Sequence, residues 1–100
     1  PPPRLTPDLF ADRVAIRAYW DQVDAKTRLY LDGLDEARFN GTVHISSPTW
    51  GEVALPVWKI LLHVANHGTD HRAQVLRLLD QLGAPTFEQD FMIYLWARGR

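Results

Sequence analysis

The sequence LHVANHGTDHRAQV, residues 62–75, decides how this chain folds. It lies within residues 56–82, a stretch that opens on a proline, has no other proline and is followed by Gly83. Proline at the start and glycine after the end are typical of a helix. Apolar residues would cover more than half of this helix's circumference, as in a helix packed among several neighbours. We therefore predict a helix over residues 56–82 that belongs to a bundle.

The residues before this stretch predict a second long helix. Thr6, Pro7 and Asp8 are typical of a helix start, where a hydroxyl caps the helix, proline fits the first position and an acid complements the dipole. Apolar residues then recur seven apart, at Leu9, Ile16, Val23 and Tyr30. This is the spacing of a bundle helix. We predict a helix over residues 7–33, after a proline-rich linker at residues 1–5.

Two shorter elements complete the prediction. Residues 42–55 favour a β-hairpin, because β-branched residues occur in both arms and a Ser-Ser-Pro sequence separates them. Residues 87–98 favour a last helix, with Thr86 as its cap. The expected fold class is all-α: a single domain of 100 residues, an incomplete helical bundle with a short β-hairpin between its two long helices. A bundle with so few helices needs partner helices, either from an upstream segment or from a second copy of the chain.

Composition excludes several function classes. Hydrophobic residues make up 46% of the chain, enough for a packed core rather than a disordered segment. Cysteine is absent, which removes disulfides, thiolate ligands and cysteine nucleophiles. A net charge of -1 argues against a nucleic-acid surface, which is usually strongly basic. No apolar run reaches the length of a membrane span. We expect a cytoplasmic protein that binds neither nucleic acid nor membrane.

Three of the four histidines lie on the predicted helix 56–82. His63, His67 and His71 are spaced four residues apart, so they follow one helix face. Two histidines one turn apart can bind one metal ion through their ring nitrogens. All three span about 12 Å at helical rise, too far to share one ion easily. The simpler interpretation is that these are hydrogen-bonded core or surface histidines, and the spacing alone leaves both open. His44 favours an exposed hairpin position.

The run 62–75 closely resembles the signature of the DinB-like (DinB/YfiT) metalloenzyme family, roughly L-H-V-x-N-H-x-x-x-H-R-x-Q. Trp58, the Leu82-Gly83 pair and the Tyr94-Leu95 pair look like further landmarks of that family. The resemblance covers essentially all 100 residues, with the histidine run as its most specific part. It implies that the chain corresponds to the C-terminal part of a family member.

The resemblance implies a four-helix bundle in which three histidines hold a divalent metal ion. His67 and His71 match two of these ligands, and the third is expected from an earlier helix outside this segment. Four neighbours are candidates for orienting the ligands or packing beside them: His63, Asn66, Arg72 and Gln74. Gly68 would permit close helix approach, and Arg72 would pair with an acidic residue. Zinc or nickel is the expected metal, with iron or copper as alternatives, because imidazole suits all four.

The expected function is that of a divalent-metal-binding protein. A metal ion held by neutral histidines lowers the pKa of a bound thiol or water. The resemblance favours a metal-dependent thiol S-transferase or isomerase that uses a low-molecular-weight thiol and a small-molecule substrate. The alternatives are a metal-dependent hydrolase and a non-catalytic metal-binding or dimerisation module. In a homodimer, His67 and His71 of two chains would give four nitrogen ligands and close the site.

Overall fold

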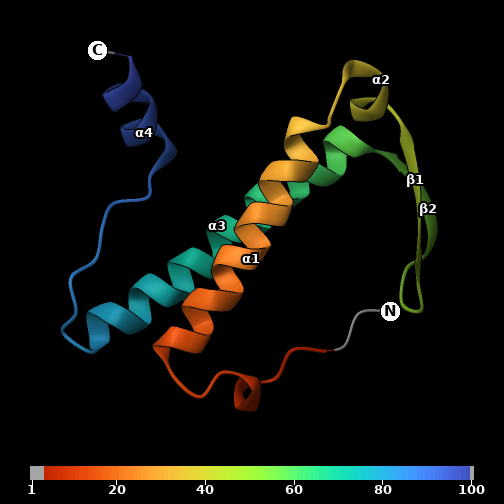
Figure 1. The fold of residues 1–100 in the computed structure, drawn as a ribbon. Coiled ribbons are helices and arrows are strands. Elements are labelled where there is room, and N and C mark those ends of the chain that lie inside the picture. The colour runs from red at the N-terminus through yellow and green to blue at the C-terminus, as the bar shows by residue number, and fades with distance from the viewer. Residues whose placement is uncertain (1–3, 100) are drawn as a thin grey trace. The chain divides into compact units, whose positions relative to one another are not determined.

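A computed structural model describes residues 4–99, which form four α-helices and one β-hairpin (Figure 1). This confirms a mostly helical fold with a small hairpin. The chain divides into two compact units, one ending at Gly41 and one beginning at Thr42. Each is described by itself. Residues 1–3 of the predicted linker lie outside the described part of the chain.

The first unit is built around α1, Arg13–Asp32. The predicted start at residue 7 is six residues too early, because Pro7–Leu9 form only a single 3-10 turn. Asp12 is the residue that caps α1: its backbone is extended and its carboxylate accepts a hydrogen bond from the Ala15 N–H at 2.9 Å. The Phe10 ring meets the Tyr19 ring edge-on, with centroids 5.3 Å apart, which turns the incoming chain back along the helix.

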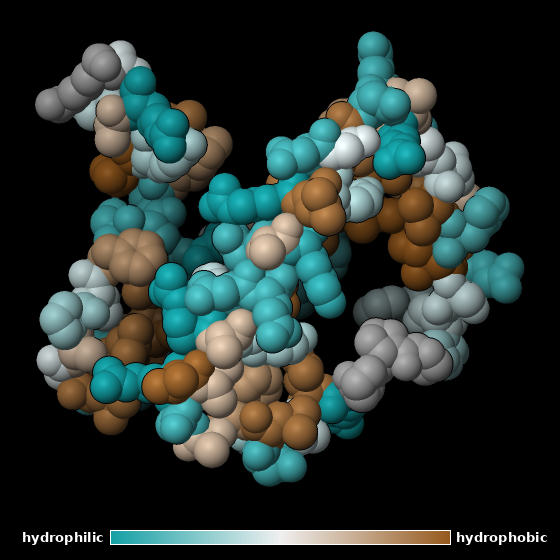
Figure 2. Space-filling model, viewed as in Figure 1, coloured by the Kyte–Doolittle hydropathy of each residue, from teal (hydrophilic) through white to brown (hydrophobic). Residues whose placement is uncertain are grey.

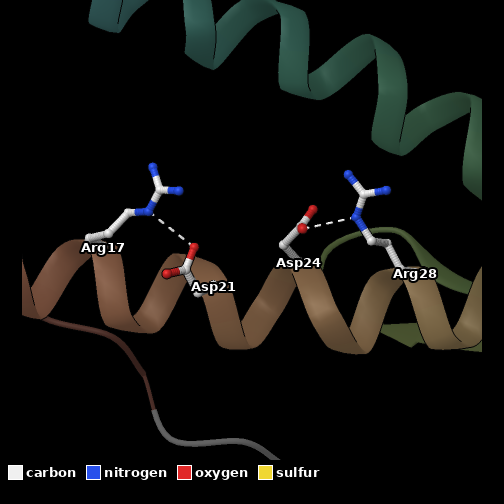
Figure 3. A network of polar contacts seen from close by, with 4 residues as sticks. All are labelled: Arg17, Asp21, Asp24 and Arg28. Atoms are coloured by element: carbon white, nitrogen blue, oxygen red, sulfur yellow. Dashed lines mark hydrogen bonds and ion pairs between the residues drawn. The ribbon is translucent and has the colours of Figure 1, made fainter.

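One face of α1 carries two ion pairs, which Figure 3 shows from close by. Arg17 Nε lies 3.1 Å from Asp21, and Arg28 Nε lies 2.9 Å from Asp24. The second pair has its acid on the N-terminal side, the more favourable order along a helix dipole. The hydrogen bond to Asp24 raises the pKa of the Arg28 guanidinium above its ordinary value. All four side chains are largely exposed, so these pairs mark a solvated helix face more than a source of stability.

A one-turn helix, α2 (Glu36–Phe39), follows α1, between the predicted first helix and the predicted hairpin. Asp35 caps it, accepting a hydrogen bond from the Arg38 N–H at 2.8 Å. The Arg38 guanidinium also donates to the Gly33 carbonyl at 3.4 Å, near the end of α1. Four residues are too few to show a helical period, which is why hydrophobic spacing does not reveal this element.

The second unit opens with the predicted hairpin, β1 (Thr42–Ser47) and β2 (Gly51–Pro56). The strands are antiparallel, in a register that pairs Thr42 with Pro56 and Ser47 with Gly51. Ser47 Oγ accepts from the N–H groups of two turn residues, at 3.2 and 3.3 Å. Alternation along the strands places apolar residues on one face of the ribbon: Val43, Ile45, Val53 and Leu55.

The long helix α3, Val57–Gln81, follows β2 directly and agrees with the prediction within one residue at each end. Gly83 ends it in a left-handed conformation with φ +73°. The Gly83 N–H bonds to the Asp80 carbonyl at 3.0 Å and the Ala84 N–H to the Leu79 carbonyl at 2.9 Å. These two bonds define a Schellman motif, which satisfies carbonyls that the helix leaves free. The prediction that Gly83 ends this helix is therefore confirmed.

The last helix, α4 (Phe91–Arg98), begins four residues later than predicted. Asp90 rather than Thr86 is its cap, since the Asp90 carboxylate accepts from the Met92 N–H at 2.8 Å. The segment before it is attached to α3 through the side chain of Gln89. The sequence pattern favours Thr86 because threonine is also a preferred N-cap residue.

Hydrophobic side chains remain at the surface throughout the described part of the chain. No side chain in residues 4–99 is buried, and the surface in Figure 2 shows hydrophobic groups interspersed with hydrophilic ones. On α3, Val64, Val75 and Leu78 are each more than half exposed. Within the same residues, no helix combines the length and the hydropathy needed to cross a bilayer.

The Schellman motif predicts a difference between two glycines that end helices. Gly83→Ala should lower the free energy of unfolding by about 1–2 kcal/mol, because a Cβ is disfavoured in the left-handed conformation. Gly33, after α1, has φ -85°, and a Cβ there would meet only ordinary contacts at 3.6 Å or more. Gly33→Ala should therefore be neutral or slightly stabilising. Urea unfolding of both variants measures this, and equal losses would contradict the assignment.

Candidate functional site

The candidate site lies in the middle of α3, on the stripe of the helix that would face a bundle core. Helical spacing places seven residues in one line along this stripe: Ile60, Val64, His67, His71, Val75, Leu78 and Leu82. The two predicted ligands are the central members, with apolar residues on either side. If other helices cover these positions, the imidazole nitrogens need hydrogen-bond partners or a bound cation. Both histidines are exposed in the described part of the chain.

The two predicted ligands approach each other closely. His67 Nε2 lies 3.0 Å from His71 Nε2, and the ring centroids are 4.5 Å apart with the planes at 85°. Both rings turn the same nitrogen toward a common point beside the helix. At this distance one nitrogen must donate a hydrogen to the other, or both must bind the same cation. The structure thus brings together the two histidines that the sequence singled out.

His63 continues the histidine row in a different manner. Its ring stacks on the His67 ring at 5.3 Å between centroids and 24° between planes. Within residues 4–99, no hydrogen bond joins a His63 nitrogen to another side chain. His63 therefore packs beside the pair, as one of its two expected roles. His44 lies apart from this row, on the hairpin face opposite the apolar one.

Gln74 meets the pair directly. Its Oε1 lies 3.0 Å from His71 Nδ1, one turn further along the helix. A histidine whose second nitrogen is held in this way presents its first nitrogen in a fixed direction, which is common among metal-ligating histidines. Of the four neighbours predicted to support the site, Gln74 has the clearest contact with a ligand. Asn66 makes no side-chain hydrogen bond within the part of the chain that the structure describes.

Arg72 lies on another face of α3, and here one prediction is wrong. Its partners are neutral rather than acidic: Nη2 donates to Thr69 Oγ1 at 3.2 Å and Nε to Gln89 Oε1 at 3.3 Å. Gly68 makes room for this guanidinium, since a Cβ at Gly68 would lie 3.0 Å from Arg72 Nη1. That Gly68 permits close helix approach stays a prediction. Arg72 is thus directed away from the histidine pair.

Gln89 is a residue that sequence reasoning missed. Besides receiving the bond from Arg72, its Nε2 donates to the Thr69 carbonyl at 3.4 Å. These bonds hold the peptide between α3 and α4 against the helix, at a sequence separation of 17 to 20 residues. No spacing rule connects residues so far apart, so no pattern in the sequence pointed to this contact.

The described residues supply two candidate metal ligands but not a complete site. Among residues 4–99, no three His, Cys, Asp or Glu side chains are arranged to hold an ion. Two nitrogens each about 2.0–2.1 Å from one ion lie roughly 2.9–3.4 Å apart for octahedral to tetrahedral angles. The observed 3.0 Å falls in this range. The donor pair therefore fits a divalent ion, and it leaves the remaining ligand positions to groups from elsewhere.

Comparison with known proteins shows which family the chain resembles. The model of the family described as DinB family matches residues 10–100. The chain belongs to the DinB family. It is 34% identical over 59 residues to Protein DinB of Bacillus subtilis (strain 168), a match that covers 59% of the chain and 34% of that relative. The chain thus matches about a third of the length of this DinB protein. No solved structure matches the chain.

The Gln89 contacts predict a local effect in this DinB family member. Gln89→Ala removes the acceptor of Arg72 and the donor to Thr69, so amide hydrogen exchange in residues 84–90 should speed up. Exchange within the middle of α3 should change little. Gln81→Ala, at the end of the same helix, serves as the matched control and should leave residues 84–90 unaffected. Unchanged exchange in the Gln89 variant would contradict the link.

Proposed function

We propose that this chain binds one divalent metal ion through Nε2 of His67 and Nε2 of His71, as part of a metal-dependent enzyme. The single observation that carries the proposal is the 3.0 Å separation of the two nitrogens, on a largely apolar stripe of α3. A random pair of surface histidines one turn apart has no reason to converge on one point. Family membership supports the proposal, because the matched region includes the entire histidine run.

The remaining ligands come, in this proposal, from helices that cover the stripe. The exposed Val64, Val75 and Leu78 surround the pair, and burying them would stabilise the protein by the hydrophobic effect. Helices that cover these residues bring their own side chains within reach of His67 and His71. An N-terminal segment would complete a four-helix bundle and supply a third histidine. Three histidine ligands would leave one coordination position of the ion open.

The proposed reaction is transfer of a low-molecular-weight thiol to a small electrophile, or an isomerisation that uses such a thiol. A divalent ion held by neutral imidazoles lowers the pKa of a bound thiol and so favours the thiolate. The chain's own residues hold and orient: the two histidines fix the site, Gln74 contacts one of them, and the apolar stripe limits the access of water. Zinc or nickel suits this donor set, with iron or copper as alternatives.

A non-catalytic dimer is the second candidate, and the exposure of the same stripe favours it. Two copies packed across a two-fold axis would bury Val64, Val75 and Leu78 against each other. Their four histidines would then give four nitrogen ligands with no open position, which is a structural site. The two candidates differ in the number of metal ions per chain.

Metal content on a sizing-column peak tests the proposal. Wild-type protein should carry about one ion per chain, and His67→Ala and His71→Ala should each lose most of it, because each variant removes one imidazole ligand of the site. His44→Ala, on the hairpin, is the matched control and should keep the ion. Half an ion per chain on a dimer would select the structural alternative. No ion in the wild-type protein would disprove the metal site.

Thiol chemistry needs its own measurement. Metal-loaded protein should accelerate transfer of glutathione, mycothiol or bacillithiol to a chromogenic electrophile, and His67→Ala or a chelator should remove that acceleration. Acceleration that persists after the metal is removed would show that the reaction does not depend on this site. Hydrolysis of an ester or amide without thiol consumption would instead identify a metal-dependent hydrolase.

A further inference from the structure

We propose that Gln74 is a positioning residue for His71: it accepts a hydrogen bond from Nδ1–H and so fixes the tautomer in which Nε2 is free to bind metal. The proposal rests on the metal site proposed above. It is carried by two contacts of one ring, the 3.0 Å distance from His71 Nδ1 to Gln74 Oε1 and the 3.0 Å distance from His71 Nε2 to His67 Nε2.

The tautomer follows from the donors and acceptors around the ring. A neutral imidazole has one N–H and one lone pair, and an amide oxygen can only accept. The nitrogen beside Gln74 Oε1 must therefore carry the hydrogen, which leaves the lone pair on Nε2. That lone pair faces His67, so the hydrogen between the two Nε2 atoms belongs to His67. The pair is asymmetric: His71 is preset for a metal ion, and His67 must move its hydrogen to Nδ1.

Glutamine suits this role better than an acid would. A carboxylate at the same place would also accept from Nδ1–H, but it would add a negative charge to the site. Asp70 adjoins His71 in the sequence, yet the hydrogen bond goes to Gln74. An ion held by neutral ligands and neutral supports keeps its full charge for lowering the pKa of a bound thiol. Gln74 thus orients the ligand without weakening the ion as a Lewis acid.

Two measurements on the full chain test the inference. The first is the His71 tautomer, read from two-bond proton–nitrogen-15 correlations in metal-free protein at a pH where imidazole is neutral. The wild-type protein should show hydrogen on Nδ1, and Gln74→Leu should show a mixture. Gln81→Leu makes the same change on the same helix away from the histidines, and its His71 signals should match the wild type. Circular dichroism and thermal unfolding confirm that each variant is folded.

The second measurement is zinc affinity by competition with a chelator, using the metal alone as the probe. Gln74→Leu should bind zinc about 10–100-fold more weakly, as is typical when a support of a ligating histidine is removed. Gln74→Glu keeps an acceptor and should restore the affinity, while Gln81→Leu should equal the wild type.

The outcomes separate this inference from the proposed function. If the wild type binds zinc and Gln74→Leu binds it equally well, Gln74 does not position His71, and the metal site stands. Hydrogen on Nε2 of His71 in the wild type would overturn the inference in the same way. If the wild type and Gln74→Glu both fail to bind zinc, the proposed function is wrong and the role of Gln74 falls with it.

Discussion

Two imidazole nitrogens held 3.0 Å apart on one turn of α3 impose the constraint on which the rest of the site depends. Two lone pairs cannot face each other at that distance, so a hydrogen or a cation must lie between them. Since His67 and His71 also lie on the apolar stripe of the helix, covering that stripe would remove the water that could otherwise solvate them. A metal ion satisfies both nitrogens at once, in the environment where an unsatisfied nitrogen costs most.

The polar residues around the histidine pair lie on two faces of α3, and each face makes a different set of contacts. On the histidine face, Gln74 holds one ring and His63 stacks on the other. On another face, Thr69 and Arg72 hold Gln89 and the peptide that leads to α4. One helix therefore presents a candidate metal site and, independently, attaches the next segment of the chain. A substitution on either face should leave the contacts of the other largely intact, because the two share no hydrogen-bond partner.

The exposed apolar stripe gives the candidate site its expected surroundings. A helix of 25 residues with Val64, Val75 and Leu78 largely exposed would gain stability from neighbours that cover these side chains. The two candidate ligands lie between apolar residues on the same line, so the groups that stabilise the helix and the groups that complete the site would have to come from the same neighbours. Folding and metal binding are then expected to be coupled.

Several features of this protein follow from its sequence alone, because they depend on residues within one or two turns of each other. The span of α3, its glycine stop, the hairpin and the approach of His67 to His71 all have local causes: helical period, a left-handed glycine, β-branched strands and a four-residue spacing. Only the tertiary structure decides that Arg72 bonds to Gln89 and that Gln89 bonds to the Thr69 carbonyl. Those contacts join residues far apart in the chain, and a pattern read along the sequence carries no information about which distant side chain will meet a given donor.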